Sequence, residues 1–197
     1  MSHMPTQFEN CIVLLMGFPG AGKRTVGDAL ALKMGARFSD HHDLVDPILK
    51  LWGDDYNVMW DMTPAMWDKF NAVHDVYLST IADACSKDSS FIITEMMFDQ
   101  DPFHKIFYDK VLSVVQKRQA HFFPIRLVCD EDELAKRVQS DGRKQYFKTR
   151  DVELSRRRSK ENEVFYSHHA NELTINNTHL SPDDVSELII KHIKSKM

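Results

Sequence analysis

The segment from Gly17 to Thr25, which reads GFPGAGKRT, constrains the fold of this chain more than any other. An apolar run, CIVLLM at 11–16, precedes it, and a helical pattern begins near Lys23. Glycines between a strand and a helix let backbone N–H groups turn inward around a phosphate, and the helix adds its positive end. A lysine here reaches the β and γ phosphates. The sequence therefore predicts a nucleotide site formed by Gly17, Pro19, Gly20, Ala21, Gly22, Lys23, Arg24 and Thr25.

Short apolar runs alternate with longer helical patterns along the rest of the chain, which is typical of a parallel sheet with crossover helices. We expect strands at 11–16, 36–40, 90–95, 122–129 and 172–176. Helices are expected where a capping residue precedes proline, at Thr63-Pro64, Asp101-Pro102 and Ser181-Pro182. The last helix should pack one stripe against the sheet, formed by Val185, Leu188, Ile189, His192 and Ile193. We predict one α/β domain over 1–197, a three-layer sandwich around a five-stranded parallel sheet.

Composition and charge exclude several classes of protein. The formal net charge of -4 gives no overall basic field, so a nucleic-acid partner is not expected. The run CIVLLMGF is far shorter than the ~20 residues that cross a bilayer, so no membrane partner is expected. Cys11, Cys85 and Cys129 lie in apolar stretches, as packing residues of a reducing cytoplasm do. The first four residues, MSHM, resemble an expression-tag remnant, so their histidine is set aside.

The pattern GxPGxGKxT, in which Arg24 follows the lysine and the hydroxyl comes one place later at Thr25, resembles the adenylate kinase form of this loop. The order of elements resembles the P-loop small-molecule and nucleoside monophosphate kinases, shikimate kinase among them. His42 with Asp46-Pro47, and LVCD at 127–130 ahead of Arg137, resemble a group of uncharacterised bacterial shikimate-kinase-like AAA-family ATPases. The resemblance implies a P-loop NTPase fold with a lid, ATP and Mg²⁺ as cofactors, and γ-phosphoryl transfer to a hydroxyl or phosphate of a small molecule.

Polar residues follow the second and third predicted strands, at the sheet edge where ligands bind in open parallel sheets. They are Asp40, His41, His42, Asp43 and Glu95. Phosphoryl transfer needs a metal partner and a group that orients the attacking hydroxyl. We therefore expect Asp40 near Mg²⁺, and Asp43 on the acceptor hydroxyl with His42 as a competing base.

Several alternatives stand beside these roles. Thr25 is expected to contact phosphate or a metal-bound water, and Glu95 resembles the acidic end of a Walker B strand that holds the magnesium shell. Asp40 or Asp43 could instead cap a helix, and Glu95 could be a partly exposed strand-end carboxylate. A zinc site formed by the pair at 41–42 is not expected, because the spacing and a cysteine partner are missing. Shikimate itself is an unexpected substrate. His42 stands where shikimate kinase has the second of two aspartates, and EMM at 95–97 stands where that kinase has a triple glycine.

Basic residues follow the fourth strand, beyond a helix that should bury Leu134 and Val138 and end near 141–142. In the kinases that the chain resembles, arginines here belong to a lid, placed at about 141–152, and Arg137 and Arg143 match best. Their planar guanidinium groups suit a transferring phosphoryl group. A solvated face is the favoured interpretation for the other basic residues, namely Lys144, Lys148, Arg150 and the run Arg156-Arg157-Arg158.

The region between the second and third strands is rich in tryptophan and methionine, with Trp52, Met59, Trp60, Met62, Met66 and Trp67. It could form an apolar wall over the acceptor, although core packing is favoured for any one of these residues.

Two rival functions remain at this level. A polynucleotide 5′-kinase uses the same loop with a carboxylate after the second strand, but it needs a basic channel. A non-catalytic ATP-binding module would use the loop to close a lid that a partner reads, and the displaced hydroxyl at Arg24-Thr25 keeps this alternative open.

Overall fold

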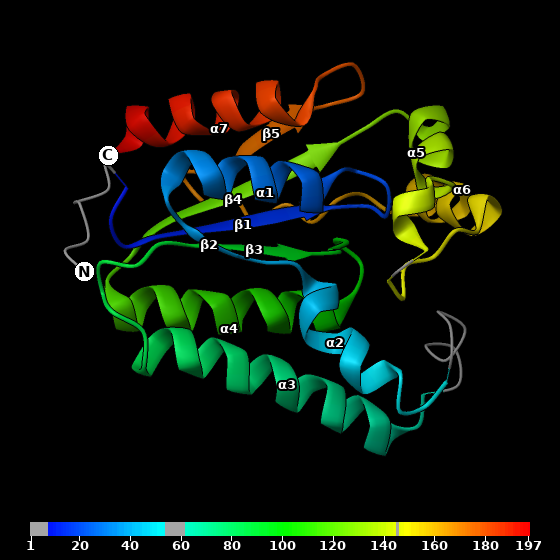
Figure 1. Cartoon of the computed structure of the whole chain (residues 1–197), viewed down its shortest axis with the longest axis horizontal. Helices are drawn as coiled ribbons and strands as arrows, with labels where there is room; N and C mark the ends of the chain where they lie inside the picture. Colours follow the sequence, from blue (N-terminus) through cyan, green and yellow to red (C-terminus); the bar gives the residue numbers. More distant parts are fainter. Residues whose placement is uncertain (1–7, 54–61, 145) are drawn as a thin grey trace.

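A five-stranded parallel sheet forms the middle layer of the protein (Figure 1). The computed structural model describes residues 8–53, 62–144 and 146–197, so the predicted tag remnant, Met59, Trp60 and residue 145 of the predicted lid lie outside the described residues. The strand order is β2-β3-β1-β4-β5, and every neighbouring pair is parallel. The strands are β1 (Cys11–Gly17), β2 (Arg37–Ser39), β3 (Phe91–Glu95), β4 (His121–Val128) and β5 (Leu173–Asn176). All five predicted strands are therefore confirmed.

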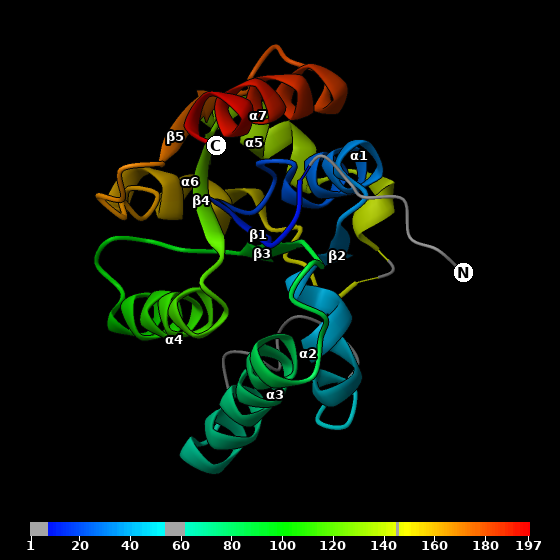
Figure 2. The same ribbon diagram turned by 90° about the vertical axis from the view of Figure 1, so that its left-hand side faces the viewer.

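Helices cover both faces of the sheet (Figures 1 and 2). One outer layer holds α1 (Lys23–Met34) and α7 (Pro182–Lys196), and the other holds α3 (Pro64–Asp83) and α4 (Pro102–Arg118). Around the carboxyl ends of the strands lie α2 (His41–Leu49), α5 (Glu131–Val138), the 3-10 turn η2 (Asp141–Arg143) and α6 (Val152–Glu161). The prediction of a three-layer α/β sandwich is confirmed.

Local signals set most helix boundaries. Thr63 and Ser181 form capping boxes ahead of Pro64 and Pro182, and Asp101 accepts the N–H of Phe103 ahead of Pro102. The stripe predicted for the last helix was wrong at Leu188, which is 44% exposed. The packed face of α7 is centred on Val185, Ile189 and Ile193, each four residues apart, with Ile190 and Ser186 beside them.

The core is continuous through the middle strand, because every residue of β1 is buried on both faces of the sheet. Cys11 is one of these residues, and burial raises the pKa of its thiol to about 11. Cys11, Cys85 and Cys129 are all free thiols. No helix in the described ranges is both long enough and apolar enough to span a membrane.

Candidate functional site

The glycine-rich loop joins the end of β1 to the start of α1, and its glycines have two different tasks. Gly20 and Gly22 have φ values of 90° and 81°, in the left-handed region where a side chain is strained. Gly17 instead allows close packing, because a Cβ there would lie 2.7 Å from the carbonyl oxygen of Leu127 in β4. The loop thus depends on glycine both for its turn and for its seat against the sheet.

Lys23 begins α1 and folds back over the loop. Its Nζ donates to the carbonyl oxygens of Gly17 at 2.7 Å and Phe18 at 3.1 Å. Burial lowers the pKa of Lys23 to about 7, although the charge of Asp40 opposes this. The ammonium group therefore lies at the loop, where two carbonyl oxygens and Asp40 support its positive charge and burial opposes it.

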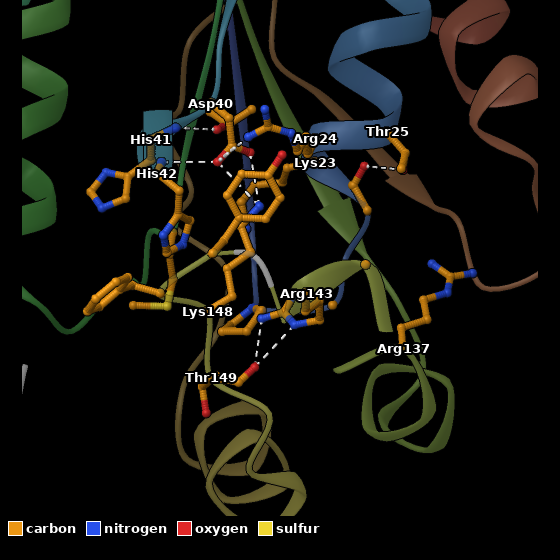
Figure 3. A pocket seen from close by; sticks show the side chains of 18 of the residues that line it. Lys23, Arg24, Thr25, Asp40, His41, His42, Arg137, Arg143, Lys148 and Thr149 are labelled. Atoms are coloured by element: carbon orange, nitrogen blue, oxygen red, sulfur yellow. Dashed lines mark hydrogen bonds and ion pairs between the residues drawn. The ribbon is translucent and has the colours of Figure 1, made fainter. Parts of the chain in front are cut away.

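A cavity of about 580 Å³ opens beside this loop (Figure 3). Three parts of the chain line it: the loop with the start of α1, the ends of β2 and β3, and described residues between 137 and 149. Among the residues predicted from the sequence, the lining includes Pro19, Gly20, Gly22, Lys23, Arg24, Thr25, Asp40, His42, Glu95, Arg137 and Arg143. Of the described residues predicted for the site, Gly17, Ala21 and Asp43 are not in the lining.

Asp40 caps a helix and also faces the cavity. It is the N-cap of α2, where its carboxylate accepts the N–H of His42 at 3.0 Å. It also faces the cavity, with Oδ1 lying 3.3 Å from Nζ of Lys148 and 3.5 Å from Nη1 of Arg24. Burial opposes ionisation of Asp40, but Lys148, His42 and Arg24 outweigh it and hold the pKa of this carboxyl below its usual range.

Asp43 and Arg24 pair with each other at the rim. Nη1 of Arg24 lies 2.8 Å from Oδ1 of Asp43, and its guanidinium lies 4.3 Å from the ring centre of Tyr146. The other carboxylate oxygen of Asp43 accepts the N–H of Asp40 and completes the capping box. The side chain of Arg24 therefore lies toward Asp40 at the start of α2 (Figure 3). The carboxylate of Asp43 is engaged by Arg24, and Asp43 is not among the lining residues.

Arg143, at the end of η2, and Lys148, a few residues later, both line the cavity. Arg143 donates from Nε and Nη2 to the carbonyl oxygen of Thr149, at 3.1 and 2.9 Å. Lys148 was expected on a solvated face, which was wrong: its side chain is only 11% exposed, between Asp40 and the ring of Tyr146. The structure thus adds Lys148 to the cations that face the loop.

Arg137 stands apart from this cluster in Figure 3. Its Nε lies 2.8 Å from Oε1 of Glu133, and its Nη2 donates to the carbonyl oxygens of Asn177 and Thr178. These contacts tie α5 to the turn after β5, so the guanidinium of Arg137 is held by that turn, whereas the guanidinium of Arg143 is held by Thr149. On α6, Arg156 pairs with Glu131, Asp132 and Glu153, as expected of a salt-bridged helix surface.

His42 and Asp46 form a hydrogen-bonded pair on α2. Nδ1 of His42 lies 2.7 Å from Oδ1 of Asp46, which is buried and also accepts the N–H of Phe147 at 3.1 Å. Burial lowers the pKa of His42, while Asp46 opposes the shift. The imidazole is therefore held by one nitrogen and lines the cavity. The sequence placed Asp46 in a motif but assigned it no role.

Glu95 ends β3 as a buried carboxylate, so the interpretation as a partly exposed strand end was wrong. Its Oε2 lies 2.7 Å from Nδ1 of His41, and its Oε1 accepts the N–H of Met96 at 3.0 Å. Burial raises the pKa of Glu95, but His41 outweighs it and lowers the pKa to about 2, while Glu95 in turn raises the pKa of His41. His74, which the sequence did not single out, lies beside both, and burial lowers its pKa to about 4.

The tryptophan-rich region packs mainly as a second core. Trp52, Met62 and Trp67 lie against a small buried cluster formed by Val45, Leu49, Phe70 and Phe147. Only Leu49 and Phe147 of this group line the cavity. Core packing, the favoured interpretation of these residues, therefore describes Trp52, Met62 and Trp67.

No protein-family model and no curated protein sequence matches the chain. Solved structures of kinases do match it over almost its whole length. Gluconokinase from Sinorhizobium meliloti 1021 is 13% identical with a TM-score of 0.63, and the match covers 96% of this chain and 95% of the other. A sugar kinase from Janibacter sp. HTCC2649 is 16% identical with a TM-score of 0.61, and the match covers 94% of this chain and 95% of the other. Shikimate kinase from Acinetobacter baumannii, solved with shikimate, is 17% identical with a TM-score of 0.59, and the match covers 97% of this chain and 96% of the other.

The chain has the P-loop kinase fold. The predicted resemblance to shikimate kinase-like folds is therefore confirmed, at identities that show the fold alone. In this fold, the cavity lies where the glycine-rich loop, the strand ends and the residues around η2 meet.

Proposed function

We propose that the protein is an ATP-dependent phosphotransferase that uses Mg²⁺ and phosphorylates a small molecule, with a hydroxyl as the favoured acceptor. One observation carries this proposal: a single cavity joins Lys23 of the phosphate loop to Asp40 and His42 at the strand ends. The likeness to gluconokinase and shikimate kinase supports the reaction class at the level of fold.

The loop fits the phosphates of a nucleotide. Gly20 and Gly22 adopt the left-handed conformations of an anion-binding turn, and α1 begins directly behind them at Lys23. Burial destabilises the charge of Lys23, so a phosphate beside it would restore a fully charged ammonium group. Bound ATP supplies the transferable γ-phosphoryl group, and Mg²⁺ neutralises part of its charge.

Oxygen donors at the cavity wall fit Mg²⁺, which prefers carboxylate, hydroxyl and water ligands. Asp40 has a lowered pKa and lines the cavity, and Thr25 of α1 lines it too, with its hydroxyl donating to the carbonyl oxygen of Gly22 at 2.9 Å. We assign Asp40 and Thr25 to this ion. Glu95 is left out of the assignment because its carboxylate is engaged by His41.

The protein's own residues would then divide the work of transfer. His42 would accept the acceptor's hydroxyl proton at Nε2, because its Nδ1 is held by Asp46. Lys23, Lys148 and Arg143 would stabilise the charge on the transferring group from three sides. The lid segment that carries Lys148 would also exclude water, so that positioning and electrostatics supply most of the rate.

The walls of the cavity favour a small hydroxylated acceptor. Its volume of about 580 Å³ is in the range of small-molecule sites. Asp28, Asp40 and Glu95 line it together with the apolar Leu49 and Phe147. Lys23, Arg24, Arg137, Arg143 and Lys148 also line it, so the walls carry both charges. The net charge of -4 gives no extended basic channel for a polynucleotide backbone, which argues for a hydroxyl on a metabolite over a nucleic-acid end.

The test is ATP consumption by the purified protein against hydroxylated metabolites, nucleosides, nucleoside monophosphates and 5′-hydroxyl oligonucleotides. Lys23→Ala removes the phosphate-binding charge, and Lys191→Ala, on the exposed side of α7, is the matched control. Turnover that depends on an acceptor, is lost in Lys23→Ala and is kept in Lys191→Ala would support the kinase and identify its substrate class. ATP binding with no acceptor-dependent turnover across the panel would instead favour the non-catalytic module.

A further inference from the structure

Three potential metal ligands converge beside the cavity without a part in the proposed transfer. Nδ1 of His41 lies 2.7 Å from Oε2 of Glu95 and 3.3 Å from Nε2 of His74, and the last two atoms lie 3.8 Å apart. The residues come from three elements: the first turn of α2, the end of β3 and the middle of α3. The fold therefore brings these groups together from distant parts of the chain.

The three facing atoms of this cluster cannot all be satisfied by hydrogen bonds to one another. A proton on Nδ1 of His41 is donated to Oε2 of Glu95, and Nε2 of His74 then directs its own lone pair at the same proton. If Nε2 of His74 carried the proton instead, the lone pair of His41 would face the Glu95 carboxylate at 2.7 Å. One proton thus lies among three electron-pair donors, and a cation in its place would satisfy all three.

We propose that His41, His74 and Glu95 bind a divalent transition-metal ion of the Zn²⁺ or Co²⁺ class. Bonds of about 2.0–2.1 Å in a tetrahedral site place ligand atoms about 3.3 Å apart. The separations of 3.3 and 3.8 Å are close to that spacing, and only the 2.7 Å contact between His41 and Glu95 has to widen. The three ligand atoms all lie within 4.8 Å of one another.

The donor set separates this ion from Mg²⁺. Two imidazoles and one carboxylate suit Zn²⁺, Co²⁺ and related ions, whereas Mg²⁺ prefers oxygen ligands alone. Three protein ligands leave a position open for water or substrate. His41 and Glu95 line the cavity, whereas His74 is buried and is not among the lining residues. The open position of the metal therefore faces the cavity. An oxygen of the acceptor or a water molecule is the ligand that this position would take.

The surroundings of the cluster fix the ligands in place. The backbone N–H of His41 donates to Oγ1 of Thr94 at 3.0 Å, and Met96 holds the second oxygen of Glu95. The rings of Phe70 and Phe107 pack edge-on against His74, with centroids 5.2 and 5.3 Å away. An apolar shell with oriented ligands is typical of a metal centre, because it limits solvent and fixes the lone pairs.

The experiment is a Co²⁺ titration of the full chain, without a histidine tag and without nucleotide, followed by visible absorption and by Zn²⁺ competition. His74→Gln removes one ligand from behind the cavity, and Glu95→Gln removes another. His121→Gln is the matched control, because His121 is exposed at the first residue of β4, at the amino-terminal end of the strands and away from the cavity. Excess Mg²⁺ is included so that Co²⁺ is kept from the oxygen ligands of the phosphate site.

We expect one equivalent of Co²⁺ to bind wild type and His121→Gln and to be displaced by Zn²⁺. His74→Gln and Glu95→Gln should weaken binding by at least about 10- to 100-fold, the loss that already follows removal of an outer hydrogen-bond partner. Circular dichroism identifies a variant that fails to fold. Such a variant is set aside, and saturable Co²⁺ binding by the wild type then decides the proposal. Absence of saturable Co²⁺ binding to wild type, or equal binding by a folded His74→Gln, would overturn the proposal.

Discussion

Nδ1 of His42 lies 2.7 Å from Oδ1 of Asp46, one turn further along α2, and the other oxygen of Asp46 accepts the N–H of Phe147 at 3.1 Å. One buried carboxylate therefore orients the candidate base and anchors the lid segment at the same time. Because a carboxylate can only accept, it holds the proton on Nδ1 and leaves the lone pair of His42 on Nε2.

Replacement of Asp46 by asparagine should invert this arrangement. The N–H of Phe147 needs an acceptor, so the amide oxygen should face Phe147 and the amide N–H₂ should face His42. His42 would then carry its proton on Nε2 and could not act as a base. We expect Asp46→Asn to lower kcat by about 10²- to 10⁴-fold, the range of general-base catalysis, with little change in KM for ATP. Steady-state kinetics on the acceptor found by the panel measure both values.

The control for this change is His42→Gln, which should lower kcat to a similar level. The double variant should then be little worse than either single variant, because the two residues act as a unit. A fully active Asp46→Asn would rule out His42 as an oriented base.

Lys148 should contribute charge to the transferring phosphoryl group. Its ammonium group is buried next to Asp40 and faces the same cavity as Lys23. Lys148→Met keeps the length of the side chain and removes the charge, and we expect kcat to fall by about 10²- to 10³-fold, as when a transition-state donor is removed. Lys144→Met is the matched control, because Lys144 is 59% exposed and pairs with Asp141 at the surface. Equal activity of the two variants would contradict this role for Lys148.

The parts of the site that depend on neighbouring residues could be predicted from the sequence, and those that depend on distant contacts could not. Lys23 follows its glycines directly, so its place at the loop is a local property. Lys148 meets Asp40 across 108 positions of the chain, and nothing around it distinguishes it from an exposed lysine. His74 lies on an ordinary helix and gains its role only where that helix brings it to His41, 33 positions away.

The same distinction separates Asp40 from Asp43. Both are acidic residues at the start of one helix, and both take part in its capping box. Asp40 faces the cavity and Asp43 does not, because the helix begins directly after Asp40 and because Arg24 forms its shorter ion pair with Asp43. Helix boundaries are the least certain element of a sequence-based prediction.

ATP binding should take up a proton at Lys23. Burial lowers the pKa of this amine to about 7 in the free protein, and bound phosphates should raise it. Below about pH 7 the amine is already charged, so affinity levels off; above it, the affinity falls by at most about tenfold per pH unit. Calorimetry at about pH 8 in buffers of different protonation enthalpy should show uptake approaching one proton. Lys23→Arg stays charged and should show none, while a flat affinity above pH 7 in wild type would contradict the prediction.

Gly17 should be required for stability rather than for turning the loop. A Cβ at this position would lie 2.7 Å from the carbonyl oxygen of Leu127 and 3.0 Å from Cβ of Ala21, and the pairing of β1 with β4 fixes that carbonyl. Overpacking costs about 1–3 kcal/mol, which exceeds the gain of about 0.4–1 kcal/mol from a less flexible unfolded chain. Gly17→Ala should therefore lower the free energy of unfolding in urea. Gly142→Ala, where a Cβ would meet no described atom within 4 Å, should keep that gain and raise the free energy of unfolding by up to about 1 kcal/mol. Equal urea midpoints for the two variants, at equal slopes, would show that the strands can separate to admit the methyl group.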